Sequence, residues 1–172
     1  MKKFLKLFLV VASISGVLIA CSKDDNSTTL RVRMTDAPAA FDAVNVDLEE
    51  VRVKYRDGGD SLSGWTTLST AAGIYDLLGL TAGVDTLIAS GVIPSNSVKE
   101  IRLVLGSDNT IVVGGVTFPL TIPSGGESGL KIKVNKSLSG PLDSLLIDFD
   151  AALSVHQNGS GDYILQPVLK IK

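Results

Sequence analysis

Apolar residues recur at every second position through most of the chain after residue 29. Leu30, Val32 and Met34 form one such set, and Val44 and Val46 continue the pattern further along. Successive side chains of a β-strand point to opposite faces, so this period indicates strands with one buried face. Gly, Pro, Asn and Asp separate the segments, as turns between short strands require. The pattern predicts an all-β domain.

The same pattern continues to the C-terminal end of the chain. Further strands are expected at 75–80, 84–89, 98–105, 110–113, 116–122, 130–134, 142–149 and 163–171. Gly114-Gly115 predicts a hairpin between two of these segments, and Asn158-Gly159-Ser160-Gly161 is the last turn. About nine to eleven short strands in one domain favour a two-sheet β-sandwich with Greek-key links, with an up-and-down barrel as the alternative.

The phase of the alternation slips once inside the second strand. Val46 and Leu48 share one parity, whereas Val51 and Val53, which follow Glu49-Glu50, have the other. One extra residue in a strand turns every later side chain to the opposite face. The slip therefore predicts a β-bulge at Glu49-Glu50 that keeps both halves of the apolar set on one face.

The first residues have the pattern of a cleavable signal. Lys2, Lys3 and Lys6 precede an uncharged apolar stretch that is shorter than the roughly 20 residues of a membrane-spanning helix. Leu18-Ile19-Ala20-Cys21 resembles the lipobox of bacterial lipoproteins, in which the thiol accepts the lipid. We expect a signal peptide at 1–20, a lipidated anchor and polar linker at 21–29, and one β-sandwich domain at 30–172. The alternative is an ordinary secretory signal with an incidental cysteine.

The residues after Cys21 resemble a localisation signal. Ser22 after the cysteine resembles lipoproteins sent to the outer membrane, and Lys23-Asp24-Asp25 resembles the tract that marks surface export in some Gram-negative lipoproteins. We expect a protein anchored to the outer membrane through the lipid on Cys21, on the cell surface or the periplasmic face. A plain solvated linker is the alternative for this tract.

Charge and cysteine content exclude several classes of function. Cys21 is the only cysteine, so no internal disulfide and no cysteine-based zinc site is expected. The chain has a net charge of −2, which falls by three when the lysines of the signal peptide are removed. Its cations alternate with acids and apolar residues instead of forming a basic stripe. Nucleic acid is therefore not an expected partner.

Three acids are candidates for a metal or acid–base site. Asp148 and Asp150 flank Phe149 in a predicted strand, so their carboxylates share a face, and Asp36 joins them if the strands meet. Such a group suits Ca²⁺ or weak hydrolytic chemistry. The alternative is structural: Asp36 bonds turn amides, and Asp148 or Asp150 pairs with a cation such as Arg102. No other cofactor is expected.

Aromatic residues are the candidates for ligand stacking. Trp65 and Tyr55 are the leading pair, with Tyr75 and Tyr163 also considered, because flat apolar rings match a sugar ring. The alternative is that these rings belong to the core. His156 is the only histidine, and the sequence has none of the common hydrolase motifs, so the protein is not expected to be an enzyme.

Several segments together resemble the domain-of-unknown-function family 4382, found in bacterial lipoproteins. In chain order, the segments that carry the resemblance are Thr35-Asp36-Ala37-Pro38, 44–51, Gly64-Trp65, Tyr75-Asp76-Leu77-Leu78, 101–105, Pro123-Ser124-Gly125, 128–131, 146–151 and Tyr163-Ile164-Leu165-Gln166-Pro167. The resemblance implies a prealbumin-like or carboxypeptidase-regulatory-like β-sandwich and no established catalytic residues. One departure lies at 92–97, where a Pro-x-Gly-x-Tyr turn is expected and both Gly and Tyr are missing.

These observations predict a non-catalytic, lipid-anchored binding or adhesion module for a glycan or a protein. Two alternatives remain: a calcium-stabilised or weakly hydrolytic carboxylate site, and a structural subunit of an envelope complex.

Overall fold

The computed structural model describes residues 27–55, 64–123 and 129–172. The strands are β1 (Thr28–Thr35), β2 (Ala43–Lys54), β3 (Trp65–Thr67), β4 (Ser69–Thr70), β5 (Gly73–Asp76), β6 (Thr86–Ile93), β7 (Ser97–Leu105), β8 (Thr110–Val113), β9 (Val116–Thr121), β10 (Leu130–Ser137), β11 (Leu142–Phe149), β12 (Val155–Gln157), β13 (Tyr163–Leu165) and β14 (Leu169–Ile171). Two single-turn helices accompany them: the 3₁₀ helix η1 (Leu77–Leu80) and α1 (Ala151–Ser154). In this described part, no helix has the length and hydropathy needed to cross a membrane.

Several predicted features lie outside the described residues. They are the signal peptide 1–20, Cys21, the tract Lys23-Asp24-Asp25, the turn at 57–60 and most of the loop at 123–129.

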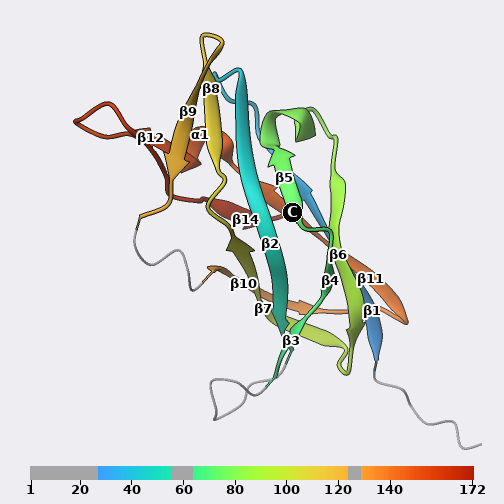
Figure 1. The fold of residues 1–172 in the computed structure, drawn as a ribbon. Coiled ribbons are helices and arrows are strands. Elements are labelled where there is room, and N and C mark those ends of the chain that lie inside the picture. The colour runs from blue at the N-terminus through green and yellow to red at the C-terminus, as the bar shows by residue number, and fades with distance from the viewer. Residues whose placement is uncertain (1–26, 56–63, 124–128) are drawn as a thin grey trace, which may run out of the picture.

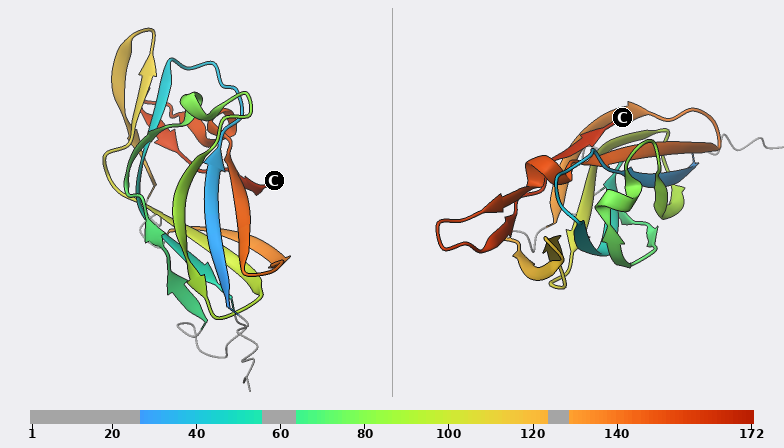
Figure 2. Two further views of the ribbon diagram at one scale, coloured as in Figure 1. Left: turned by 90° about the vertical axis from the view of Figure 1, so that its right-hand side faces the viewer. Right: turned by 90° about the horizontal axis from the view of Figure 1, so that it is seen from above.

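The strands form two packed sheets, so the predicted all-β sandwich is confirmed. One sheet has the order β14-β11-β1-β6-β4, and the other has the order β10-β7-β2-β8-β9-β13-β12, with β3 and β5 also paired to β2. In Figure 2 (left), β6, β1 and β11 run side by side in one layer. The chain crosses repeatedly between the sheets, because β1 and β2, β6 and β7, and β10 and β11 each lie in different sheets. An up-and-down barrel would join each strand to its neighbour in one closed sheet, so these crossovers between two sheets exclude it.

The core lies between the two sheets and is built from the alternating residues. Leu30, Val32 and Met34 of β1 are almost fully buried, as are Ile147 and Phe149 of the neighbouring strand β11. β1 pairs with β11 in parallel and with β6 in antiparallel orientation, so it sits in the middle of its sheet. Burying each large aliphatic side chain contributes about 1.5–3 kcal/mol, which makes this face the main source of stability.

β2 is the longest strand, and it carries the predicted bulge. Its pairing with β7 shifts between Leu48 and Glu50, while Val46, Leu48, Val51 and Val53 are all buried. The first half of the strand pairs with β5 and β8, and the second half pairs with β3 and β7. The bulge therefore lies where β2 exchanges partners, and it keeps both halves facing the same core.

The segment at 75–80 was expected to be a strand throughout, and this is wrong for its second half. Residues 77–80 form η1, whose N-cap is Asp76: the side chain of Asp76 accepts a hydrogen bond from the N–H of Leu78. An aspartate in this position satisfies a free amide of the first turn and so favours a helix start.

The predicted strand at 163–171 is interrupted. Pro167 lies between β13 and β14, which belong to different sheets. Proline cannot donate a hydrogen bond to a ladder, so it ends one pairing before the next begins. The described residues contain fourteen strands, more than the nine to eleven expected, because several are only two or three residues long.

Other local predictions are confirmed. β8 and β9 form a hairpin across Gly114-Gly115, and both glycines have positive φ.

The segment 92–97, which departs from the expected Pro-x-Gly-x-Tyr turn, forms a short turn between β6 and β7. In this turn the hydroxyl of Ser95 accepts a hydrogen bond from the N–H of Ser97 at 3.1 Å. Serine builds such turns without a glycine.

The β8–β9 hairpin and the start of β1 lie at opposite ends of the molecule (Figure 1). In that view the hairpin is at the top, and the chain enters β1 at the lower right. This placement separates any site on the hairpin from the point where the chain leads back toward Cys21.

Candidate functional site

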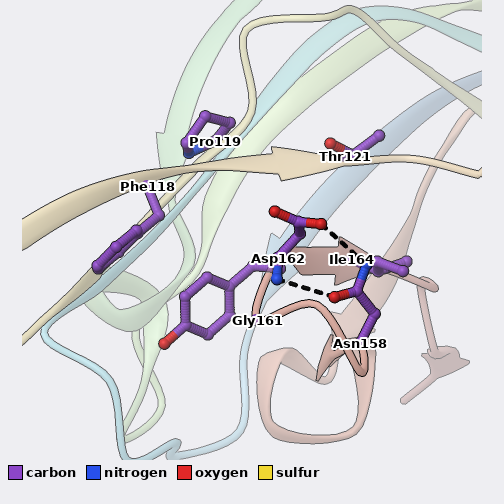
Figure 3. A pocket seen from close by; sticks show the side chains of 8 residues that line it. Phe118, Pro119, Thr121, Asn158, Gly161, Asp162 and Ile164 are labelled. Carbon is purple, nitrogen blue, oxygen red and sulfur yellow. Dashed lines mark hydrogen bonds between the residues drawn. The ribbon is translucent and has the colours of Figure 1, made fainter.

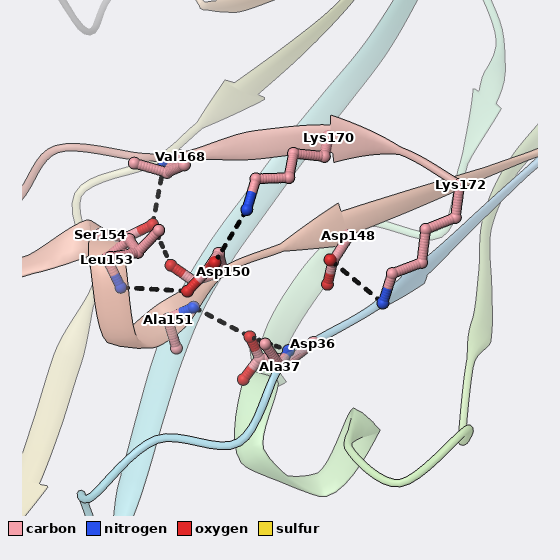
Figure 4. Close-up of polar contacts among 10 residues, drawn as sticks. All are labelled: Asp36, Ala37, Asp148, Asp150, Ala151, Leu153, Ser154, Val168, Lys170 and Lys172. Carbon is pink, nitrogen blue, oxygen red and sulfur yellow. Dashed lines mark hydrogen bonds and ion pairs between the residues drawn. The ribbon is translucent and has the colours of Figure 1, made fainter.

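The structure brings the three predicted acids together at the end of β1. β1 and β11 run in parallel with Thr35 opposite Asp148, so Asp36, which follows β1, lies beside the residues that end β11. The side chains of Asp36, Asp148 and Asp150 come from chain segments more than a hundred residues apart, and all three residues are buried. Figure 4 shows them at the junction of β1, β11 and α1.

Asp36 ties β1 to α1. Its Oδ1 atom accepts one hydrogen bond from the N–H of Ala37 at 2.7 Å and another from the N–H of Ala151 at 2.9 Å. Burial raises the pKa of Asp36 to about 6, the charges of Asp148 and Asp150 act in the same direction, and the two amide hydrogen bonds oppose them. The predicted structural role of Asp36, bonding turn amides, matches these contacts.

The other two acids pair with lysines of β14 and its C-terminal neighbour. Asp148 contacts Lys172 at 3.1 Å, and Asp150 contacts Lys170 at 3.3 Å (Figure 4). Asp150 lies just past the end of β11 and caps α1 by accepting the N–H of Leu153 at 3.1 Å. The structural alternative predicted that Asp148 or Asp150 pairs with a cation such as Arg102. Both acids do pair with a cation, but the partners are Lys172 and Lys170.

This arrangement does not favour a metal site. Oδ2 of Asp36 and Oδ1 of Asp148 are buried without a hydrogen-bond partner. Within the described ranges, however, no group of three or more His, Cys, Asp or Glu side chains is arranged to hold a metal ion. Two of the three carboxylates are already neutralised by lysine. The calcium site stays a prediction, and the contacts fit a structural clamp that fastens β14 to the end of β11 and α1 to β1.

The two leading aromatic candidates come from adjacent positions where β2 ends and β3 begins, but their side chains have different surroundings. Trp65 pairs with Lys54 across β2 and β3, next to Tyr55. The guanidinium of Arg102 covers the Trp65 ring at 4.7 Å from the ring centroid. Tyr55 is half-buried and packs against the core. Ligand stacking at this pair stays a prediction, and the contacts favour a packing role.

A different aromatic pair borders an open groove. Phe118 of β9 and Tyr163 of β13 lie with ring centroids 5.3 Å apart and planes tilted by 50°. They meet because β13 pairs with β9 in parallel, with Tyr163 opposite Leu120. Sequence reasoning considered Tyr163 but missed Phe118. The signal for Phe118 was Pro119, which marks an edge strand when it occurs inside a strand pattern.

The groove has a volume of about 390 Å³ and combines apolar and polar walls. It is lined by Phe118, Pro119, Thr121, Asn158, Gly161, Asp162, Tyr163 and Ile164. Figure 3 shows Phe118 on the side of β9 that carries Asn158 and Asp162 of the β12–β13 turn, with Pro119 on the other side of the strand.

The polar wall is fixed by its own hydrogen bonds. Oδ1 of Asn158 accepts from the N–H of Asp162 at 2.8 Å, and Nδ2 of Asn158 donates to Oδ2 of Asp162 at 3.1 Å (Figure 3). Within the described residues, the Tyr163 hydroxyl makes no hydrogen bond. The groove thus offers aromatic surface beside a fixed carboxylate and an unused hydroxyl.

The edge of β9 is open beside this groove. Between Val116 and Pro119, β9 pairs only with β8 on one side, and β13 joins the other side only at Leu120 and Thr121. Phe118 is 36% exposed as a result. Exposed aromatic surface next to preorganised polar groups is typical of a ligand site.

Comparison with known proteins identifies the family of the chain. A family model described as a domain of unknown function (DUF4382) matches residues 27–167, which is most of the chain. The chain belongs to the DUF4382 family. No curated protein and no solved structure was found to match it. The match begins one residue before β1, at Ser27, so the DUF4382 unit includes Thr28 and Thr29, which the sequence pattern had assigned to the linker.

Proposed function

We propose that this DUF4382 chain is a non-catalytic lipoprotein of the outer membrane that binds a glycan in the Phe118–Tyr163 groove. The observation that carries the proposal is this tilted aromatic pair beside Asn158 and Asp162. A sugar ring has apolar C–H faces that pack on aromatic rings and hydroxyls that bond carboxylates and amides. The groove offers both kinds of group within one wall.

The position of the groove supports a role in display. It lies on β9 and the β12–β13 turn, toward the end of the molecule from which the β8–β9 hairpin projects (Figure 1). If Cys21 carries the lipid, the chain approaches the membrane from the start of β1 at the other end. An anchored chain then holds its ligand site away from the lipid. This geometry suits an adhesion module on the cell surface or facing the periplasm.

Glycan binding is tested with the lipidated protein in detergent on an array of neutral and charged pyranosides, followed by calorimetry of the strongest hit. We expect Phe118→Ala to weaken binding roughly tenfold, which corresponds to about 1.4 kcal/mol and to the upper range of a single aromatic contact. Tyr163→Phe removes the unused hydroxyl and weakens binding less.

Matched variants keep the test specific. Tyr75→Phe removes a hydroxyl that donates to the carbonyl of Ala71 at 2.5 Å, outside the groove lining. Val116→Ala changes an exposed residue at the hairpin tip without touching the lining. Neither should alter glycan affinity. Absence of any binding glycan, or equal losses in these controls, would contradict the proposed ligand, and a protein ligand would then be sought.

Localisation is tested separately on intact cells. Cys21→Ala should remove the protein from the outer-membrane fraction, because Cys21 is the only cysteine in the sequence and no other thiol can take the lipid. Cleavage by external protease indicates display on the cell surface, and protection until the outer membrane is broken indicates the periplasmic face. A Cys21→Ala protein that stays in the outer-membrane fraction would contradict the anchor.

A further inference from the structure

Exposed aliphatic side chains cross the outer face of the five-stranded sheet at the end where the chain enters it. Thr29 of β1 pairs with Leu142 of β11 on one side and with Val92 of β6 on the other. Val92 is 65% exposed and Leu142 is 48% exposed. Leu30, the next residue of β1, points inward and is fully buried. Leu142, Thr29 and Val92 therefore form one continuous row on the solvent face, here called the basal row.

An unpaired cation follows the basal row. Arg31, in the next outward position of β1, is exposed and lies between Ser144 and Ser90. In the part of the chain that the structure describes, Arg31 forms no ion pair or hydrogen bond through its side chain.

The charged neighbours of Arg31 on these strands are compensated. Arg33 pairs with Asp85, and Asp143 pairs with Lys136 at 3.0 Å. Among the described residues, this corner therefore has one cation without an ion-pair partner beside two exposed aliphatic residues. Exposed aliphatic side chains beside a cation match the interface of an anionic lipid bilayer, where apolar groups enter the acyl boundary and cations meet phosphates.

The chain length also places this corner close to the membrane. Six residues separate Cys21 from Thr28, the first residue of β1. An extended chain spans at most about 3.6 Å per residue, so Thr28 cannot lie more than roughly 25 Å from a lipidated Cys21. The row begins at the very next residue, Thr29. A second copy of the chain or a protein partner would not be brought to this corner by the same constraint.

We propose that the basal row and Arg31 form a lipid-contacting surface that seats the domain on the anionic bilayer to which Cys21 is anchored. This inference rests on the lipid anchor of the proposed function and does not depend on the glycan groove. Seating through the row fixes the end of β1 at the lipid, which orients the β8–β9 hairpin and its groove away from the membrane (Figure 2, left). The protein is then a spacer of defined orientation and not a freely tumbling tethered domain.

The test uses site-specific fluorescence on the lipidated full-length mature protein. Its own cysteine carries the lipid on sulfur, so a cysteine introduced elsewhere is the only free thiol. Val92→Cys and Leu142→Cys are labelled with an environment-sensitive dye and reconstituted into vesicles of phosphatidylethanolamine and phosphatidylglycerol. Val116→Cys is the matched control, because Val116 is also a valine on an edge of the molecule and is 54% exposed.

We expect blue-shifted emission at 92 and 142, and roughly twofold stronger quenching by spin-labelled lipid there than at 116, as for side chains at the acyl boundary. Arg31→Glu should reduce the quenching at 92 without changing the fold. Equal quenching at all three sites, or stronger quenching at 116, would overturn the proposal. A shift that grows with protein density and is not quenched by lipid would assign the row to a second copy instead, and would also overturn it.

Flotation of the vesicles tests the lipid anchor independently of the lipid-contacting surface. If the wild-type protein does not float with the vesicles, the anchor itself has failed. If it floats while position 92 remains as solvent-exposed as position 116, the anchor stands and the lipid-contacting surface is wrong.

Discussion

The carboxylate of Asp36 accepts a hydrogen bond of 2.9 Å from the backbone N–H of Ala151, across 115 positions of sequence. This bond links the end of β1 to the start of α1. It lies next to two ion pairs, Asp148 with Lys172 and Asp150 with Lys170, that hold β14 in the same place. Carboxylates therefore fasten α1 to the end of β1, and they reinforce the backbone pairing of β14 with β11.

Asp36 makes the stability of the fold depend on pH. Its pKa is raised from 3.8 to about 6 in the folded protein, so the native state holds a proton that the unfolded chain releases. The groups facing it are Asp148, Asp150, Lys170 and Lys172. Its contribution is complete below pH ~4 and is lost as the pH rises through about 6, at up to about 1.4 kcal/mol per pH unit.

Asp36→Asn removes this titration and keeps an oxygen that accepts the two amide bonds. We expect the variant to gain stability relative to wild type between pH ~4 and ~6, measured by urea unfolding at several pH values. Val116→Ala, an exposed substitution at a residue that does not titrate, is the control and should leave the pH profile unchanged. Parallel profiles for wild type and Asp36→Asn would contradict the prediction.

Ser154 joins α1 to the start of β14. It is fully buried, its hydroxyl donates to the carbonyl of Asp150 at 2.5 Å, and its oxygen accepts from the N–H of Val168 at 2.8 Å. Ser154→Ala leaves the partly buried N–H of Val168 without its acceptor, whereas the carbonyl of Asp150 still accepts from the backbone N–H of Ser154 at 3.0 Å. We therefore expect a loss of about 1 kcal/mol in thermal or urea unfolding. Ser160→Ala, in the exposed β12–β13 turn, serves as the control. A loss in Ser154→Ala no larger than in that control would show that the bridge carries no stability.

The bulge in β2 predicts an unusual tolerance to deletion. Leu48 pairs with Leu105 and Glu50 with Val104, so Glu49 is the extra residue. Removing Glu49 leaves every other pairing of β2 in place and restores simple alternation. We expect this deletion to fold, with a cost near 1 kcal/mol from local rearrangement.

Deletion of Asp47 is the matched comparison. It shifts Val44 and Val46 by one position relative to their partners and turns them from the core to solvent. We expect loss of cooperative unfolding in that variant. Circular dichroism and thermal melts distinguish the two deletions, and equal damage from both would refute the assignment of Glu49 as the extra residue.

Gly129 allows a close approach that an alanine would block. Its φ is +75°, and a Cβ built there would lie 2.6 Å from Cγ of Arg102 and 3.0 Å from the carbonyl oxygen of Leu103. Arg102 covers the ring of Trp65, the only tryptophan. We expect Gly129→Ala to cost about 1–3 kcal/mol and to change the tryptophan emission as Arg102 moves.

Gly140 supplies the control for that substitution. Its φ is +73°, but a Cβ there meets nothing within 4 Å. Gly140→Ala therefore carries only the backbone strain of about 1–2 kcal/mol and should leave tryptophan emission unchanged. A change of emission in both variants would show that strain alone, and not the contact with Arg102, disturbs the ring.

The sequence by itself determined the fold class and several local features. Period-two alternation placed Leu30, Val32 and Met34 on a buried face, and the change of parity around Glu49 located the bulge. Gly114-Gly115 located a hairpin turn. These features follow from local preferences, because the direction of a side chain and the type of a turn depend on residues close in the chain.

Only the tertiary structure decided which distant residues meet. Asp148 and Asp150 form ion pairs with lysines at the C-terminal end of the chain, Lys172 and Lys170. Phe118 contacts Tyr163 because β13 pairs in parallel with β9. Alternation specifies which face of a strand is buried but not which strand lies beside it. Strand pairing is a long-range choice made by packing two sheets around one core, so the candidate groove and the carboxylate clamp become visible only in the folded chain.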